Sequence, residues 1–285
     1  MKKISRHTCF KILKVSFLVL VVIFISCNRI PDNVARNLEQ AGDNKNELLK
    51  VIKHYENDEE KLAAAYFLIG NMDTRFSREG DFSAYYKIFD LVDSLDKLGV
   101  ARKEIENVAK PAMQDLEKKL GPVPVENCSI NEDLEYIDAE YLIKNIDQAF
   151  EVRKTKLWCK NVDFSTFCNF SLPYRVYEEP LSDFRTFFRK ELAWLDDSLK
   201  NKSDMAEACR LVNNFMYSKF IFVEEIEKIP PPSAVEMYKL GAGNCEQRYY
   251  MIVSAMRSVG LPVAIAFTVQ WNHWAGRHSW VSLQY

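Results

Sequence analysis

Cys245 stands between a glycine-rich turn and a segment with helical periodicity. Gly241 and Gly243 permit a positive φ and a close approach of the backbone, and Asn244 is a residue type that caps helix N-termini. We therefore expect a helix that begins at Cys245. Since a cysteine reacts as its thiolate and a helix N-terminus favours an anion, this position would lower the pKa of the thiol. The free backbone N–H groups there would also form part of an oxyanion hole.

A histidine on another element would take the proton from such a thiol. His278 lies in the segment 277–285, whose alternating pattern predicts a strand. Alternation places His278, Trp280 and Ser282 on one face. His273 lies in the predicted loop before this strand and is less firmly placed. The alternatives are a structural cysteine in a tight turn and a core histidine that is hydrogen-bonded within a sheet.

The rest of the chain predicts an α+β fold, in which a helical N-terminal region precedes a core with antiparallel strands after the Cys245 helix. Amphipathic patterns predict helices within 46–57, 59–72, 81–99, 101–121, 138–158 and 203–218. Pro111 should kink or split one of them, and Gly99 should end another. Residues 121–129 read as a linker, and two strands are expected within 262–271 and 277–285.

Residues 1–26 have the pattern of an export signal. Five basic residues precede an apolar run from Val15 to Ile25, and Ser26 stands before Cys27. The pattern resembles a bacterial lipoprotein signal, which implies that Cys27 becomes acylated and ties the protein to a membrane of the cell envelope. The alternative is an uncleaved anchor helix. We therefore divide the chain into a signal at 1–26, a helical region at 27–125 and a second domain at 126–285.

Charge and cysteine spacing exclude several functions. Removal of residues 1–26 takes five of the 38 Lys and Arg residues and none of the 40 Asp and Glu residues, which leaves a net charge of about −7. So acidic a protein has no electrostatic footprint for nucleic acid. No C-x-x-C spacing is present, so we expect no structural zinc site. No other metal and no organic cofactor follows from the sequence. Cys128, Cys159, Cys168 and Cys209 are expected to be buried or paired, and a bridge between Cys159 and Cys168 is one option.

The motifs around Cys245 and His278 resemble those of the transglutaminase-like superfamily. The shared features are Gly-x-Gly-x-Cys at a helix start, then "SVGLPVAIAF", then Gly-x-His-x-Trp on a strand. The stretches "LIKNIDQAF" and "LPYRVYEEPLSDFR" are similar to a helix-rich lipoprotein branch of Bacteroidetes type, and the resemblance covers residues 135–285. It implies a papain-like fold with Cys245 as nucleophile and His278 as general base. Trp280 would pack beside them.

One part of the family pattern has no counterpart here. In the family an acidic residue on the strand after the histidine orients the imidazole, but no Asp or Glu follows Glu246. The resemblance therefore implies a chain that is truncated at its C-terminus, an orienting residue from elsewhere, or a degenerate site.

The implied function is thiol acyl transfer, with hydrolysis of an amide or peptide bond in a peptide or protein substrate that is linked to cell wall or glycan. Asn244, Glu246, Trp271 and Trp280 are expected to line the oxyanion and substrate cleft, and Trp274 lies nearby. The rival hypothesis is a non-catalytic lipoprotein scaffold that uses a degenerate core to bind a peptide or glycan.

Overall fold

The computed structural model describes residues 30–270 and 278–284. The expected lipidation site at Cys27 lies outside the described residues, and so do Trp271, His273 and Trp274. Within the described ranges, no helix is both long and apolar enough to cross a membrane. The mixed α+β class is confirmed.

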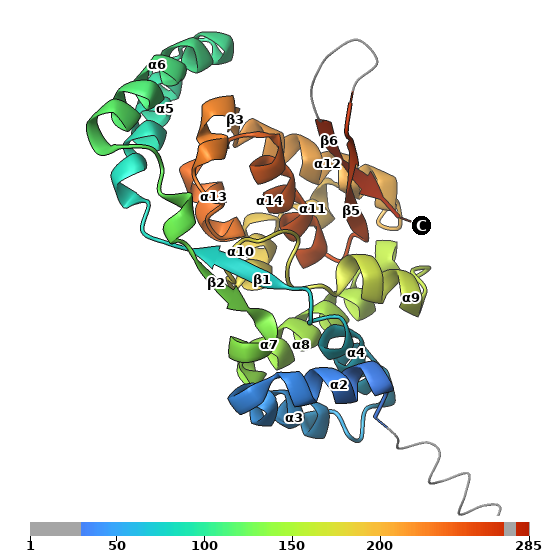
Figure 1. The fold of residues 1–285 in the computed structure, drawn as a ribbon. Helices are drawn as coiled ribbons and strands as arrows, with labels where there is room; N and C mark the ends of the chain where they lie inside the picture. Colours follow the sequence, from blue (N-terminus) through green and yellow to red (C-terminus); the bar gives the residue numbers. More distant parts are fainter. Residues whose placement is uncertain (1–29, 271–277, 285) are drawn as a thin grey trace, which may run out of the picture.

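Three N-terminal helices pack against a long helix from the middle of the chain (Figure 1). They are α2 (Asp32–Gln40), α3 (Lys45–His54) and α4 (Glu59–Gly70), and the long helix is α8 (Ala139–Thr155). Leu48 and Val51 of α3 are fully buried with Leu142 and Ile146 of α8. Each such apolar side chain contributes about 1.5–3 kcal/mol when it is removed from water. Residues on both sides of position 125 thus share one hydrophobic core.

Helices α5 (Lys87–Lys97) and α6 (Arg102–Leu120) form an arm on one side of the molecule (Figure 1). Gly99 has a φ of +75°, as expected for a glycine that follows a helix. Of the two expected effects of Pro111, a split is wrong, because α6 runs continuously through it, and a kink stays a prediction. The buried side chains of Ile105, Ala109 and Met113 lie on both sides of the proline and hold the two halves in one helix.

A two-stranded sheet that the sequence patterns did not indicate joins the arm to the helices below it. Strand β1 (Phe76–Glu79) pairs antiparallel with β2 (Ser129–Glu132), and Phe76 lies opposite Glu132. Both strands are short and mostly polar, so no apolar alternation marks them. The pairing crosses the predicted boundary at 125/126.

The C-terminal core is built around the buried helix α14 (Cys245–Ser258). Helices α10 (Phe184–Glu191), α12 (Met205–Ser218) and α13 (Ala234–Leu240) cover it. Two arginines fix its C-terminal end. Arg185 donates to the carbonyl of Arg257 at 2.8 Å and to that of Ser171 at 2.7 Å. Arg257 donates to the carbonyl of Arg175 at 2.9 Å.

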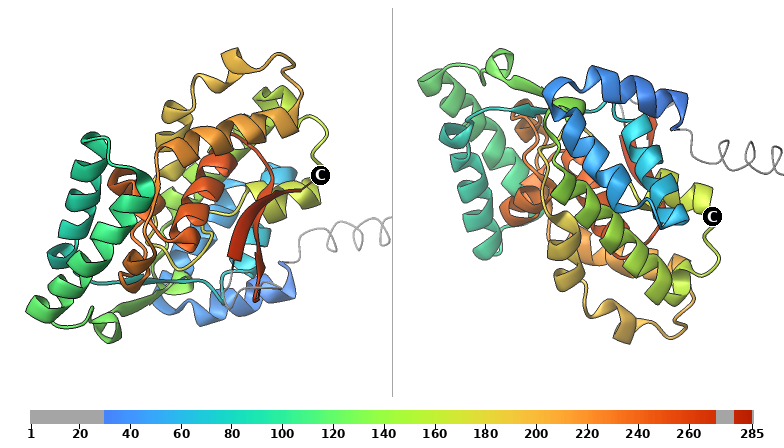
Figure 2. Two further views of the ribbon diagram at one scale, coloured as in Figure 1. Left: turned by 90° about the horizontal axis from the view of Figure 1, so that it is seen from above. Right: turned by 90° about the horizontal axis from the view of Figure 1, so that it is seen from below.

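The predicted pair of strands after α14 is confirmed. Strand β5 (Val263–Thr268) pairs antiparallel with β6 (His278–Leu283), with Val263 opposite Leu283. The views in Figures 1 and 2 place this hairpin on one side of α14 and the α5–α6 arm on the other. Val281 and Leu283 pack against the core around α14.

The remaining elements are short. They are α7 (Asp133–Tyr136), α9 (Phe164–Thr166), the π-helix η5 (Phe167–Ser171), α11 (Leu195–Ser198), β3 (Ile221–Phe222), β4 (Ala242–Gly243) and the single-turn 3₁₀ helices, of which η6 (Glu224–Lys228) borders α14.

Candidate active site

A reciprocal cap fixes the first turn of α14. The Asn244 side chain accepts the backbone N–H of Gln247 at 2.8 Å, and the Gln247 side chain accepts the backbone N–H of Asn244 at 3.0 Å. This capping box satisfies two donors that a helix start otherwise leaves free. It confirms the prediction that Asn244 is the N-cap and that Cys245 opens the helix.

The two glycines before Cys245 serve different purposes. Gly241 has a φ of +66° and follows α13 in the left-handed conformation that glycine adopts readily. Gly243 lies so close to its surroundings that a Cβ atom there would be 2.5 Å from Oε1 of Gln247. The parallel pairing of β4 with β3 holds the turn, since Val223 donates its N–H to the carbonyl of Gly243 at 2.9 Å.

Gln247 also ties the helix start to the loop in front of it. Its buried Nε2 donates to the carbonyl of Ile229 at 3.0 Å and to that of Ile226 at 3.4 Å. One side chain therefore caps α14 and positions η6. The backbone on which Cys245 sits is held from both sides.

The Cys245 thiol is free and half-buried. Burial raises its pKa, and the carboxylate of Glu246 raises it further. The backbone N–H groups of Glu246 and Cys245 and the Arg248 guanidinium act in the opposite direction. The expectation that the helix start would lower the pKa of this thiol is therefore wrong as a net effect, because desolvation outweighs the backbone hydrogen bonds.

Arg248 and two tyrosines form a wall beside Cys245. Arg248 is one helical turn after Cys245, a spacing that places both side chains on the same side of α14. Its guanidinium carbon lies 4.3 Å from the ring centre of Tyr217 and 5.0 Å from that of Tyr249. The two tyrosine hydroxyls are hydrogen-bonded at 2.7 Å. Burial raises the pKa of Tyr217 to about 12, and the hydrogen bond to Tyr249 adds to this effect.

A cavity of about 280 Å³ opens against the other side of the first turn. Asn244, Glu246 and Gln247 line it from the helix start. Opposite them lie Pro230, Pro231, Tyr177 and the ion pair between Arg78 and Glu178, whose Nε–Oε2 distance is 2.5 Å. The cavity is large enough for one amino-acid side chain. Asn244 and Glu246 line it and Cys245 does not, so their role in a substrate cleft stays a prediction.

His278 opens strand β6, the second strand of the hairpin that follows α14. Strand β5 follows α14 directly and packs along it in the reverse direction. Thr268, at the end of β5, pairs with His278 at the start of β6.

The His278 ring lies on one face of this hairpin together with Trp280. The two rings stack with their centres 6.4 Å apart, which confirms that they share a face. Val281 and Leu283 point to the opposite face, toward the core around α14. His278 therefore lies on the hairpin face turned away from α14. The pairing of Cys245 with His278 stays a prediction.

The remaining described cysteines are structural. Cys128, Cys159, Cys168 and Cys209 are all free, so the expected option of a Cys159–Cys168 bridge is wrong. Cys159 donates to the carbonyl of Gly260 at 3.3 Å, next to the end of α14, whereas Cys168 belongs to the core of the N-terminal helices. Burial raises the pKa of Cys159 and Cys168 to about 12.

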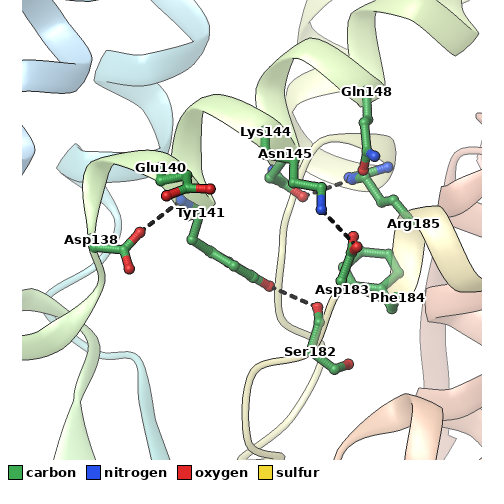
Figure 3. A pocket seen from close by; sticks show the side chains of 10 residues that line it. All are labelled: Asp138, Glu140, Tyr141, Lys144, Asn145, Gln148, Ser182, Asp183, Phe184 and Arg185. Carbon is green, nitrogen blue, oxygen red and sulfur yellow. Dashed lines mark hydrogen bonds and ion pairs between the residues drawn. The ribbon is translucent and has the colours of Figure 1, made fainter.

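A separate pocket between α8 and α10 does not contain these groups (Figure 3). Most of its polar side chains bind one another. Lys144 forms an ion pair with Asp183 at 2.7 Å, and the Tyr141 hydroxyl donates to the carbonyl of Ser182 at 3.3 Å. Arg185 donates to Asn145 at 2.7 Å. These contacts hold α10 against α8. The pocket offers no reactive group.

Two residues near Cys245 were not predicted from the sequence, namely Gln247 and Arg248. The spacing of Gln247 from Asn244 is that of a capping box, so this signal was present. The spacing of Arg248 from Cys245 indicated a shared helix face. Its stacking on Tyr217 depends on how α12 packs and had no local signal.

Comparison with known proteins gives one match. The family model of the transglutaminase-like superfamily matches residues 193–284, a range that includes α12, α13, α14 and the hairpin. Searches of curated proteins and of solved structures gave no match. The match supports a transglutaminase-like domain in this part of the chain.

Proposed function

We propose that Cys245 is the nucleophile of an acyl-transfer site that hydrolyses an amide or peptide bond, with His278 as its general base. The supporting observation is the position of Cys245. It is a half-buried free thiol at the first residue of a doubly capped helix, within the region that matches a transglutaminase-like domain, and its neighbours Asn244 and Glu246 line a cavity.

The reaction follows from these positions. The imidazole of His278 takes the thiol proton, and Sγ of Cys245 bonds to the carbonyl carbon of the substrate. The N–H groups of Cys245 and Glu246 point to the sulfur side of the turn and would stabilise the oxyanion. The C–N bond then breaks as the imidazolium gives its proton to the leaving amine. Water attacks the thioester, the C–S bond breaks, and the thiol regains its proton through His278.

A general base is required here because the thiol is not ionised in advance. Burial and Glu246 raise the pKa of Cys245, so only a small fraction is thiolate near neutral pH. Reaction with His278 requires its ring to turn from the Trp280 face toward the helix start. We propose that an orienting residue, on a strand beside β6 or elsewhere, fixes the ring in that position.

The setting of the enzyme is part of the proposal. The signal at 1–26 and Cys27 suggest an exported lipoprotein of the bacterial cell envelope, held to the membrane by a lipid anchor. Its substrate would be a peptide or protein, linked to cell wall or glycan. Asn244 and Glu246, which line the 280 Å³ cavity, would border the substrate. Trp271 and Trp280 are proposed to border another part of the substrate cleft.

Trapping of the acyl-enzyme tests the proposal. The full chain is incubated with a mixture of envelope-derived peptides, quenched in acid, and mapped by peptide mass spectrometry. We expect a hydroxylamine-sensitive adduct on Cys245 that is absent from Cys245→Ala and at least tenfold lower in His278→Gln. Arg210→Gln, an exposed change on α12, should leave the adduct unchanged. If iodoacetamide labels Cys245 no faster than Cys209 and no adduct forms, the nucleophile assignment is wrong.

Two observations favour a second candidate, a scaffold that binds a peptide or glycan without catalysis. The pKa of Cys245 is raised, and the His278 ring stacks on Trp280 on the far face of the hairpin. In that case Cys245→Ala would bind the same peptides as the unaltered chain in pull-down experiments, and no adduct would appear.

A further inference from the structure

Arg248 is a cation whose bonding capacity is largely unused. Its Nη2 donates to the Tyr249 hydroxyl at 3.2 Å. Its Nε is shielded from solvent and has no hydrogen-bond partner, and its Nη1 has none among the described residues. Within the same residues, no carboxylate forms an ion pair with it.

A half-buried guanidinium group with unused hydrogen-bond donors lowers the stability of a folded protein. Guanidinium groups that are half-buried normally bind carboxylates, often through two parallel hydrogen bonds. Two other arginines of this chain bind a carboxylate through two hydrogen bonds. Arg210 on α12 contacts Glu207 at 2.7 Å and Arg189 on α10 contacts Glu151 at 2.7 Å. Arg248 instead stacks on aromatic rings, which hold its plane in a fixed orientation.

The position of Arg248 connects it with the candidate nucleophile. It lies one turn after Cys245 on the same side of α14, and side chains on a helix lean toward its N-terminus. The guanidinium and the thiol are close enough for the charge of Arg248 to influence the thiol. An anion that is bound to Arg248 would therefore lie next to the carbon that Cys245 attacks.

We propose that Arg248 binds a carboxylate of the substrate, either a terminal carboxylate or that of an acidic side chain, next to the bond that is cleaved. Tyr217 and Tyr249 position the guanidinium so that its Nη1 and Nη2 edge faces the ligand. A singly charged carboxylate fits one guanidinium better than a phosphate dianion does, because the carboxylate of Glu246 is adjacent. This inference rests on Cys245 as the nucleophile and adds the chemical class of its substrate.

Two alkylating reagents of similar size test the proposal. Iodoacetate and iodoacetamide both form an Sγ–CH₂ bond with release of iodide, and they differ in that one carries a carboxylate. The rate of modification of Cys245 is measured for each by peptide mass spectrometry on the full chain. The ratio of the two rates cancels any change in the fraction of thiolate.

We expect Arg248→Gln to lower the iodoacetate-to-iodoacetamide ratio about tenfold, as loss of a charge-assisted pair implies, and the matched change Arg210→Gln to leave it unchanged. Arg248→Lys should keep part of the ratio, because it keeps the charge without the planar fork. In the unaltered chain, acetate should protect Cys245 from iodoacetamide whereas acetamide should not, which tests the site without any variant.

The outcomes separate the two proposals. Modification of Cys245 by iodoacetamide with the same ratio in Arg248→Gln, or no protection by acetate, overturns the carboxylate site and leaves the nucleophile standing. If iodoacetamide modifies Cys245 no faster than the half-buried Cys209, the nucleophile assignment fails and the substrate class fails with it.

Discussion

Asn244 and Gln247 cap each other, each side chain bonded to the backbone N–H of the other at 2.8 and 3.0 Å. Cys245, the candidate nucleophile, lies between these two capping residues. Everything proposed for Cys245 depends on the rigidity of this arrangement, because a thiol attacks efficiently only from a fixed position.

Gln247→Ala should weaken the whole C-terminal core. It removes a cap and leaves the carbonyls of Ile226 and Ile229 without their buried donor, so we expect a loss of about 2–4 kcal/mol in the free energy of unfolding. Urea denaturation measures it. Gln148→Ala on α8, which loses one exposed hydrogen bond to Thr186, should cost less than about 1 kcal/mol. Equal losses in the two variants would contradict the role given to Gln247.

The variants Gly243→Ala and Gly42→Ala distinguish the effect of a steric clash from the effect of backbone strain on stability. A Cβ at Gly243 would lie 2.5 Å from Gln247 Oε1 and 3.0 Å from the Phe220 ring, so the cap must shift, at a cost of about 1–3 kcal/mol. Gly42 has a φ of +55° and open space around it, so alanine there should cost about 1 kcal/mol. Only Gly243→Ala should change the rate at which iodoacetamide modifies Cys245. An unchanged rate would show that the turn tolerates the methyl group.

Removal of the charge at Glu246 should make Cys245 more reactive. Its carboxylate raises the pKa of the thiol, so Glu246→Gln lowers that pKa and increases the thiolate fraction at any pH below it. We expect the rate with iodoacetamide at pH 7.5 to rise ~2–3-fold, since one pKa unit corresponds to a tenfold change. Glu140→Gln, on the exposed side of α8, is the control. A slower rate in Glu246→Gln would mean that the carboxylate assists the thiol.

The pH dependence of labelling reports whether His278 acts on Cys245. Without a base, the rate should rise only as pH approaches the raised pKa of the thiol. If His278 takes the proton, an additional rise should appear at a lower pH than the one set by the thiol alone. This rise should disappear in His278→Gln and persist in His54→Gln on α3. A profile with the rise in all variants would exclude His278.

Arg185→Lys should destabilise the protein strongly although the charge is retained. Arg185 donates four hydrogen bonds of 2.7–2.9 Å to carbonyl groups and Asn145 from a fully buried position, and a lysine ammonium cannot span these acceptors. We expect a loss of about 3 kcal/mol or more in the free energy of unfolding. Arg189→Lys, one turn along at a half-exposed ion pair with Glu151, should cost less than about 1 kcal/mol. A small loss at Arg185 would indicate that water replaces the missing donors.

Features that have a signal within a few residues of sequence could be predicted. Features that depend on tertiary packing could not. The cap at Asn244, the helix from Cys245, the positive φ of Gly241 and the two strands after α14 all have signals within a few residues. The pairing of β1 with β2 joins polar segments about 50 residues apart along the chain, so no local pattern marked it. The raised pKa of Cys245 follows from burial by α12 and its neighbours, which no turn motif encodes.

The β1–β2 pairing has a consequence for protein synthesis. Strand β1 leaves the ribosome long before β2, and until residues 129–132 emerge it has no partner for its ladder. The N-terminal helices must wait equally for α8 to complete their core. A recombinant product that stops at residue 125 would therefore keep an orphan strand and an open hydrophobic face, and we expect it to be a target for chaperones and proteases.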